Sequence, residues 1–459
     1  MVQSRHNALI WLLLVLLPAL WIGIGVAHDA QLEEVPNDQV DEMPPPLLSP
    51  ITSIQGRLIF LMGGEALSEP DPLGTRPMSQ LAAAILLAQA HHADEAQEQF
   101  SKACAATYDA PEPDLANAVH AVIEAFALKK HSPAEPVAVT SEQWSILESR
   151  LEWFGQMAKA QLTGDANATQ ELDARSGALL LTILAAGGWF LMAGLAGLVC
   201  IVVLGWLAFT GRITSSIHAD RSVRAVLGET FLVWMILFLG LRWAASALLV
   251  SDEPDAMQMW LSVVLSFASL ASLAWARWRG VTWSSLRKAA GIQFSGGLLR
   301  LAGLSSISYA TALPCMAVGV AIGQFLSTIL EGQNFQDMSH PVQEMLPSAG
   351  LPLLIALFFV ATVAAPIVEE IVFRGLLYGH VRQQTWKWPK WLSIMAAMLF
   401  SATLFAAIHP QGVLAVPALA GVSIGFCITR EWSGSVVPGM VAHGFHNGVL
   451  LALNLLLNA

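Results

Sequence analysis

Eight long apolar runs most strongly limit the folds open to this chain. They lie at Leu180–Phe209, Ala225–Val250, Trp260–Ala276, Leu304–Leu330, Leu351–Tyr378, Trp391–His409, Val413–Thr429 and Ser435–Leu457. Each is within the ~17–25 residues that cross a bilayer as a helix, or longer. In lipid, every backbone polar group needs a partner within the protein, so only helices and closed barrels span. Only 12% of the 459 residues are charged, against about 25% in soluble proteins. The sequence therefore predicts an all-α polytopic membrane protein built as a helical transmembrane bundle.

The charges between these runs predict how the chain is oriented. Lys and Arg cluster in 211–224, 277–293 and 380–390, whereas 251–259 and 331–350 are acidic. Cytoplasmic loops are enriched in Lys and Arg. All three basic segments fall on one side if every run spans. We therefore expect a multi-pass protein of a bacterial cytoplasmic membrane, with residues 28–176 on the outer side.

Residues 1–27 carry Arg5 and then the apolar run Ala8–Ala27. This run has the character of a retained membrane anchor or of a signal peptide with a cleavage site after Ala27. We favour the anchor, because the run is longer than the ~7–15 apolar residues of a signal peptide. In either case the segment that follows is exported.

Residues 28–176 are predicted to form an exported, mainly helical soluble domain at the amino end. They contain 23 of the 34 acidic residues and 8 of the 23 basic residues, which argues against nucleic-acid binding. The acidic, proline-rich part 28–50 is expected to be a linker. Helices are expected at Leu81–Ala90, Ala93–Ala106, Leu115–Leu128 and Trp144–Leu162, separated by helix breakers. Such a domain could recruit a protein partner.

Three charged residues stand inside the apolar stretch Ala365–Tyr378, namely Glu369, Glu370 and Arg374. A charge near the bilayer centre costs from about 2.5 to more than 10 kcal/mol, so these side chains need partners or a task. Glu370 and Arg374 are four residues apart and can pair on one helix face. Glu369 points about 100° away and is free to face a different cavity. Pro366 is expected to loosen the helix just upstream.

Two later runs add histidines. Phe405 precedes His409 by four residues, and His443 precedes Asn447 by four, which places each pair on one helix face. A carboxylate and two histidines from separate helices can converge in a bundle and activate water or bind a metal. The plain alternatives are a structural ion pair for Glu370 with Arg374 and a helix-capping role for His409.

A serine-hydrolase pattern, GxSxG, occurs at Gly421–Gly425. A nucleophile elbow needs a strand, a turn and a helix, whereas this copy lies within an apolar run. Glycines four residues apart favour close helix packing. We therefore interpret Gly421–Gly425, and likewise Gly319–Gly323, as packing positions.

The order EExxxR, FxxxH, HxxxN, each motif in its own apolar run, resembles the CPBP family. This family contains type II CAAX prenyl endopeptidases and bacteriocin-processing or self-immunity proteins. The resemblance covers Leu351–Leu457 well and extends loosely to Leu304. It implies a peptidase core at 304–459. The apolar runs before that core predict additional transmembrane helices at 177–303.

The resemblance also implies a role for each motif residue. Glu369 would activate water, His409 would hold that water or a metal, and His443 with Asn447 would stabilise the oxyanion. The supporting residues would be Glu370, Arg374 and Phe405. A divalent metal, with zinc as the first choice, would be held by Glu369, His409 and His443, and its participation is left open. The absence of an HExxH helix excludes a zincin site.

The implied activity is an intramembrane endopeptidase that cuts a membrane-associated substrate, of which CAAX-type prenylated proteins are one class. The alternative is a non-enzymatic binding or immunity scaffold, or a proton-coupled transporter, because intramembrane Glu and His also mark proton relays. Transporters often carry repeated halves with broken helices. The polar set occurs once here, which favours the peptidase.

The predicted depth of His409 in the membrane conflicts with a site that it shares with Glu369. It lies about 27 Å along a helix that starts at Trp391, farther than Glu369 if that helix ends at Tyr378. We expect Trp386–Ser393 to lie along the membrane interface, so that the span starts later and Pro410 falls within the bundle.

Overall fold

The computed structural model describes residues 10–14, 16, 50–61, 71–74, 76–106, 110–132, 138–217, 220, 222–248, 255–294, 296–330, 346 and 349–457. Within these ranges every regular element is a helix and no strand occurs, which confirms the all-α class. The expected linker at 28–50, apart from Pro50, and most of the amino-terminal run lie outside the described residues. The chain divides into two compact units. The first comprises Met1–Glu34 and Gly188–Leu455, and the second comprises Val35–Gly187 and Leu456–Ala459.

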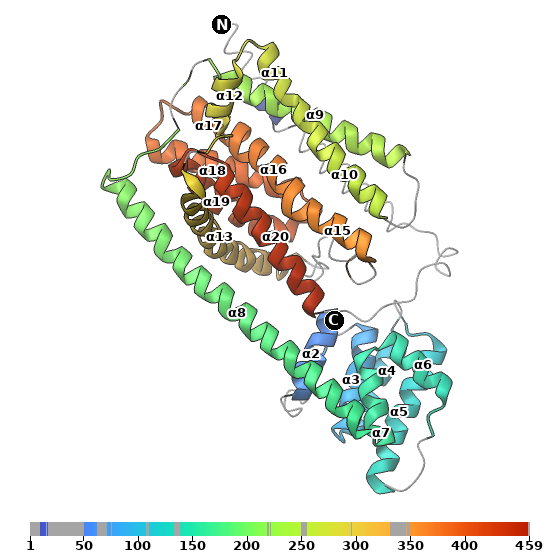
Figure 1. Ribbon diagram of the computed structural model, residues 1–459. Helices are drawn as coiled ribbons and strands as arrows, with labels where there is room; N and C mark the ends of the chain where they lie inside the picture. Colours follow the sequence, from blue (N-terminus) through green and yellow to red (C-terminus); the bar gives the residue numbers. More distant parts are fainter. Residues whose placement is uncertain are drawn as a thin grey trace. The chain divides into compact units, whose positions relative to one another are not determined.

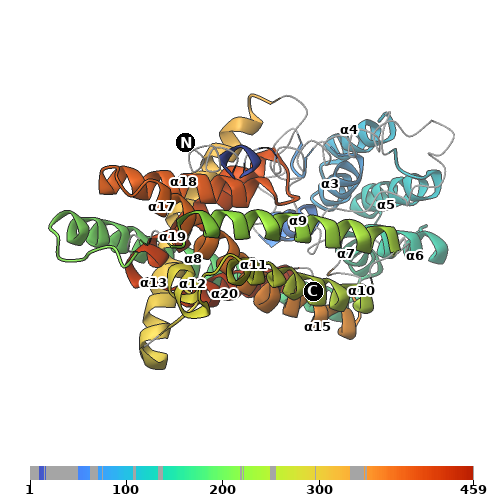
Figure 2. The ribbon, with the colours of Figure 1, turned by 90° about the horizontal axis from the view of Figure 1, so that it is seen from above.

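The second unit is an array of short helices. They are α2 (Pro50–Leu61), α3 (Pro77–Gln89), α4 (Ala93–Cys104), α5 (Pro113–His131), α6 (Ser141–Arg150), α7 (Trp153–Thr163) and the beginning of α8 (Ala166–Phe209). Figure 2 shows α3, α4 and α5 next to one another, and α3 is buried along nearly its whole length. The single helix expected at Trp144–Leu162 is wrong. The chain breaks between α6 and α7 at Glu152, whose φ of 45° no α-helix can contain.

Local polar contacts fix the ends of this array. The Thr140 hydroxyl accepts from the Gln143 backbone N–H at 3.2 Å, and the Gln143 side chain accepts from the Thr140 N–H at 2.9 Å. This capping box satisfies N–H groups that the first turn of α6 leaves free. On α4, Gln99 and Lys102 donate to the Asp71 carboxylate at 3.2 and 3.1 Å, and these hydrogen bonds hold the pKa of Asp71 below its ordinary value.

Seven helical runs among the described residues are long and apolar enough to cross a membrane. They are Ala166–Phe209, Arg224–Ala245, Ala256–Trp278, Gly297–Ser327, Leu351–Gln384, Lys390–Ala407 and Val413–Ser433. They correspond to the first seven expected spans. A helix, α20 (Val437–Leu457), also forms where the eighth was expected, although it is not one of these seven.

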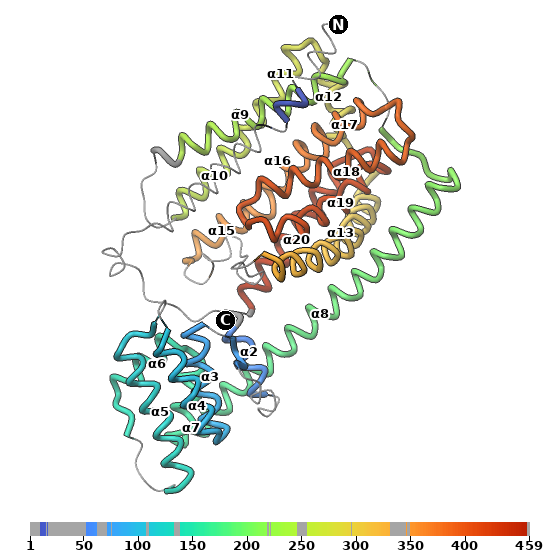
Figure 3. The backbone as a smooth tube through the Cα atoms, turned by 180° about the vertical axis from the view of Figure 1, so that it is seen from behind, coloured from blue at the N-terminus to red at the C-terminus, as the bar shows by residue number. Residues whose placement is uncertain are grey.

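The membrane runs that follow α8 contain α9 (Arg224–Leu248), α10 (Ala256–Ser269), α11 (Leu273–Trp278), α13 (Gly297–Ser327), α15 (Leu351–Phe359), α16 (Ala365–Glu369), α17 (Tyr378–Gln384), α18 (Lys390–Ala407) and α19 (Val416–Ser433). The short helix α12 (Trp283–Ala290) lies between two of these runs. Figures 1 and 3 show α13, α18, α19 and α20 alongside the run from α15 to α17. In the same views α10 lies next to α9. On α9 the buried Glu229 pairs with Arg279 at 2.6 Å and accepts from the Trp275 indole at 2.9 Å, which ties α9 to α11.

Helices α13 and α19 pack backbone against backbone. A Cβ at Gly421 would lie 2.2 Å from the Cys315 carbonyl oxygen, and one at Gly425 would lie 2.3 Å from the Ala312 Cα. Gly319 is equally tight against the Pro417 carbonyl oxygen, at 2.1 Å. These contacts confirm the packing interpretation of the GxSxG pattern.

The helix that carries Glu369 is longer than expected, and this corrects the predicted depths. It continues six residues past Tyr378 to Gln384, and α18 begins at Lys390 after a short turn. At 1.5 Å per residue, Glu369 lies about 22 Å from the Gln384 end, and Phe405 lies about 22 Å from the Lys390 end. Glu369 and Phe405 therefore lie at matched depths in a hairpin, and His409, which follows the end of α18, packs back against Phe405 with ring centroids 4.4 Å apart. Ending the first helix at Tyr378 was the main source of the mismatch, and the interfacial position of Trp386–Ser393 stays a prediction.

We expect Gly425→Leu to destabilise the bundle, because the added side chain meets backbone that cannot rotate away. Overpacking of this kind costs about 1–3 kcal/mol or more. The measurement is thermal unfolding of the purified full-length protein in detergent. Gly205→Leu is the matched control, since a Cβ there meets nothing within 4 Å. Equal losses of stability in the two variants would contradict the packing role.

Candidate active site

Glu369 and Glu370 stand where the helix changes its hydrogen-bond register. Two π-helical stretches, η5 (Val360–Ala364) and η6 (Glu370–Leu377), flank the short helix α16. Such stretches are rare in proteins overall, and those that occur often lie at functional sites. The two neighbouring carboxylates differ in exposure: the Glu369 side chain is 22% exposed and that of Glu370 is 1% exposed.

Glu370 and Arg374 form a fully buried ion pair. Arg374 Nη1 lies 3.0 Å from Glu370 Oε1, and neither side chain is more than 1% exposed. The guanidinium lies over the Phe405 ring at 4.3 Å and over the Phe426 ring at 5.3 Å from the centroids. Cation–π contacts stabilise a desolvated cation, and the carboxylate supplies its countercharge. Phe405 of the FxxxH motif therefore supports Arg374 directly.

His443 lies between the two carboxylates. Its Nδ1 is 3.2 Å from Glu370 Oε1, and its Nε2 is 3.7 Å from Glu369 Oε2. The ring also packs against Phe426, with centroids 5.3 Å apart. One turn earlier on α20, a Cβ at Gly439 would lie 2.8 Å from Glu370 Oε2. The glycine therefore lets α20 approach closely enough for His443 to reach both acids.

His409 follows the end of α18 and reaches the same place. Its Nδ1 lies 2.6 Å from the Phe405 carbonyl oxygen. A carbonyl only accepts, so Nδ1 carries the hydrogen and Nε2 keeps its lone pair in the neutral ring. The ring centroids of His409 and Phe405 are 4.4 Å apart, and those of Phe405 and His443 are 6.2 Å apart, so Phe405 lies next to both histidines. The structure thus brings together the residues of the EExxxR and FxxxH motifs and His443.

Asn447 forms a hydrogen bond with the backbone of η5, just before the helix α16 that carries Glu369. Its Nδ2 donates to the Ala361 carbonyl oxygen at 2.8 Å. In the register of η5, Ala365 N–H bonds to Val360 O, so the next donor would come from residue 366. That residue is proline, which has no N–H. Asn447 supplies the missing donor, which agrees with the expected loosening of the helix at Pro366.

Other side chains hold further carbonyls of the same helix. The Ser401 hydroxyl of α18 donates to Phe373 O at 2.9 Å, and Arg430 Nε of α19 donates to Arg374 O at 3.3 Å. Ser401 and Arg430 were not singled out from the sequence. His446, the residue before Asn447, lies against Tyr309 of α13, with ring centroids 6.1 Å apart.

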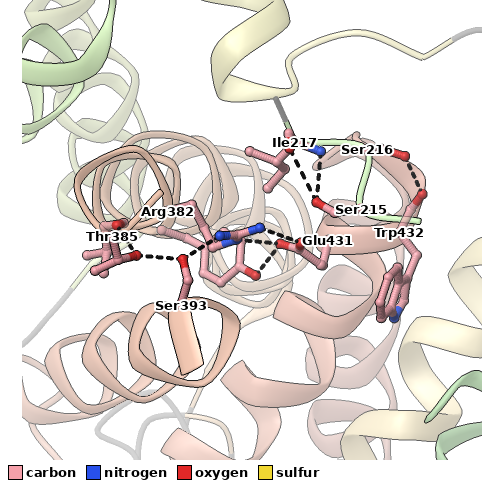
Figure 4. Close-up of polar contacts among 10 residues, drawn as sticks. Ser215, Ser216, Ile217, Arg382, Thr385, Ser393, Glu431 and Trp432 are labelled. Carbon is pink, nitrogen blue, oxygen red and sulfur yellow. Dashed lines mark hydrogen bonds and ion pairs between the residues drawn. The ribbon is translucent and has the colours of Figure 1, made fainter. Parts of the chain in front are cut away.

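A second buried polar network lies toward the end of α17 (Figure 4). Arg382 pairs with Glu431 at 3.0 Å and also donates to the Ser393 hydroxyl, and the Tyr378 hydroxyl donates to Glu431 at 2.6 Å. The assignment of Arg382 to a basic loop is therefore wrong, because α17 continues and buries it. The sequence did contain a signal for the partner of Arg382, because Glu431 is an acidic residue just after the apolar run Val413–Thr429.

The residues predicted to hold a metal do not fit one in this arrangement. Among the described residues, no group of three or more His, Cys, Asp or Glu side chains is placed to hold an ion. Both ring nitrogens of His443 face carboxylates. We therefore derive no step through a metal.

Comparison with known proteins agrees with this geometry. Residues 351–449 match the family model described as type II CAAX prenyl endopeptidase Rce1-like. No curated protein and no solved structure matches the chain. The matched segment begins with α15 and contains all three motifs, and together with the seven candidate spans it makes the chain a multi-pass integral membrane protein. Residues 351–449 are therefore similar to the Rce1-like domain of a CAAX-type membrane protease family, which agrees with the resemblance to the CPBP family.

Proposed function

We propose that this protein is an intramembrane endopeptidase in which Glu369 activates the attacking water. One observation carries the proposal. Of two adjacent carboxylates, Glu370 is buried against Arg374, whereas Glu369 is 22% exposed and has His443 Nε2 at 3.7 Å. An accessible carboxylate without a guanidinium partner can accept a proton, and a buried ion-paired one is poorly suited to do so.

The surrounding groups support a complete hydrolysis. A water between Glu369 and His409 Nε2 gives one proton to Glu369 as its oxygen bonds to the substrate carbonyl carbon. The resulting oxyanion accepts a hydrogen bond from His443 in its imidazolium form, whose Nδ1–H donates to Glu370. The oxyanion then collapses, the C–N bond breaks, and Glu369 returns its proton to the leaving amine. Such preorganised donors usually supply the largest part of the rate enhancement.

His443 as a cation also balances the local charge. Two carboxylates and one guanidinium leave a net charge of −1 in a buried site, and an imidazolium between the acids cancels it. Both ring nitrogens of an imidazolium donate, which suits a ring that faces one carboxylate on each side. We assign Asn447 a positioning role through Ala361 in place of the oxyanion contact that the resemblance implied.

The family suggests the substrate class. We propose a membrane-associated substrate, with CAAX-type prenylated proteins as the first candidates, cut in the membrane of a bacterial cell. We further propose that residues 28–176 lie on the outer side and recruit a protein partner, because their acidic composition suits a basic surface. A non-enzymatic scaffold or a proton-coupled transporter is the alternative that the next experiment separates.

We expect Glu369→Gln to lower the cleavage rate by about 10²–10⁴-fold, the usual contribution of a general base. The amide keeps the size of the side chain but cannot accept a proton. The measurement is cleavage of prenylated and unprenylated membrane peptides by the purified protein. Unchanged unfolding temperature controls for folding, and activity that survives in the variant would contradict the assigned base. No cleavage of any peptide by the wild type, after substrate trapping has also failed, would favour the non-enzymatic alternatives.

Breaking the buried ion pair should lower the stability of the folded protein. Arg374→Met leaves Glu370 buried without its countercharge, which costs about 3–5 kcal/mol. The double variant Glu370→Gln with Arg374→Met removes both charges and should recover much of this loss. Thermal unfolding of Arg374→Met, of Glu370→Gln and of the double variant tests the coupling. Additive losses would show that the pair does not interact as described.

Metal removal separates two forms of the mechanism. If Glu369 and His409 position the water without an ion, treatment with a strong chelator should leave cleavage within about two-fold of its starting rate, less than 0.5 kcal/mol in the barrier. The alternative proposal, zinc held by Glu369, His409 and His443, requires activity to disappear on chelation and to return on adding zinc. Bound zinc in the purified protein, measured by elemental analysis, gives an independent readout.

A further inference from the structure

A cavity of about 320 Å³ lies between the end of α17, the start of α18 and the amino-terminal helical segment. Its apolar wall is formed by Trp11, Val381, Trp388, Ala396 and Phe400. The volume is within the range of small-molecule pockets, ~300–1,000 Å³. The cavity is separate from the candidate active site, because Gln384 on its wall is about 22 Å along the helix from Glu369.

One polar group of the wall has no partner. Gln384 Nε2 is buried and makes no hydrogen bond. The neighbouring Thr385 hydroxyl is already engaged, with the Val381 carbonyl oxygen at 2.8 Å and the Ser393 hydroxyl at 2.6 Å. A buried donor left unpaired costs about 1–3 kcal/mol. A ligand that offers one hydrogen-bond acceptor beside an apolar body would therefore suit this cavity.

The residues around the cavity are typical of a membrane interface. Trp386, Trp388 and Trp391 are 44%, 50% and 67% exposed, and such tryptophans mark the level of lipid headgroups. Lys387 and Lys390 are exposed between them. Basic residues near the headgroups attract anionic lipids. Because Trp388 is part of both the cavity wall and this aromatic group, the cavity reaches the interface.

We propose that this cavity binds one acyl chain of an anionic phospholipid from the bilayer. The chain fills the space between Trp11, Phe400 and Ala396. Its ester carbonyl accepts a hydrogen bond from Gln384 Nε2 once the amide turns toward the cavity, and the headgroup phosphate lies near Lys387 and Lys390. A phospholipid acyl chain contacts the apolar wall, its ester accepts from the unpaired donor, and its phosphate is attracted by the two lysines. A plain hydrocarbon would make only the apolar contacts.

The test measures bound lipid and does not depend on catalysis. The full-length protein is reconstituted in vesicles of phosphatidylglycerol and phosphatidylcholine and extracted into mild detergent, and retained phospholipid is counted by native mass spectrometry. We expect wild type to retain phosphatidylglycerol. Ala396→Phe fills the cavity and should reduce retention by about ten-fold, the equivalent of 1.4 kcal/mol. Leu399→Phe adds an aromatic ring to the same helix at a 51% exposed position and should retain wild-type lipid.

Two further variants test the polar contacts. Gln384→Leu should weaken retention by up to about ten-fold, the worth of one hydrogen bond, for both lipids. Lys387→Gln combined with Lys390→Gln should remove the preference for phosphatidylglycerol over phosphatidylcholine. Equal lipid retention in Ala396→Phe and wild type, or equal loss in Leu399→Phe, would overturn the proposal. Displacement of the lipid by a farnesylated peptide at equimolar amounts would also overturn it, by assigning the cavity to substrate. A failure here leaves the assignment of Glu369 untouched.

Discussion

The buried ion pair between Glu370 and Arg374 is the interaction on which the membrane bundle depends. Two charges with almost no exposed surface are stable only if neighbouring groups offset the cost of burying them. The pair therefore dictates its surroundings: Phe405 and Phe426 cover the guanidinium, and His443 reaches the carboxylate at 3.2 Å. These groups come from α18, α19 and α20. One residue from each of the other two motifs, Phe405 and His443, therefore lies against this pair.

The backbone of the same helix imposes a second constraint. Two π-helical stretches and a proline leave carbonyl groups without their usual donors, and in a membrane no water is available to replace them. Asn447 donates to Ala361 O, Ser401 to Phe373 O and Arg430 to Arg374 O. His443 and Asn447 share a face of α20, and each satisfies a different need. His443 contacts the two carboxylates of the site. Asn447 stabilises the helix that carries them.

The sequence predicted the parts that depend on local rules. Lipid forces long apolar runs into helices, so the spans were found, and the i,i+4 spacing of Glu370 and Arg374 gave their pairing and left Glu369 apart. It did not predict the end of the helix after Tyr378. The polar residues beyond it resembled a loop, but Arg382 is buried by Glu431, which comes 49 residues later. Asn447 was assigned to the oxyanion for the same reason: its partner is a carbonyl freed by Pro366 on another helix, which no local pattern specifies.

The two buried networks are joined through consecutive residues of α19. Arg430 donates to the Arg374 carbonyl, and Glu431 pairs with Arg382 two turns farther along the same helix. The segment from η6 to α17 is thus held near its beginning and near its end by one rigid neighbour, so its register cannot slip by a residue. A slip would rotate Glu369 by about 100° and exchange the open carboxylate for the buried one. The fixed register therefore keeps the Glu369 carboxylate partly exposed and the Glu370 carboxylate buried.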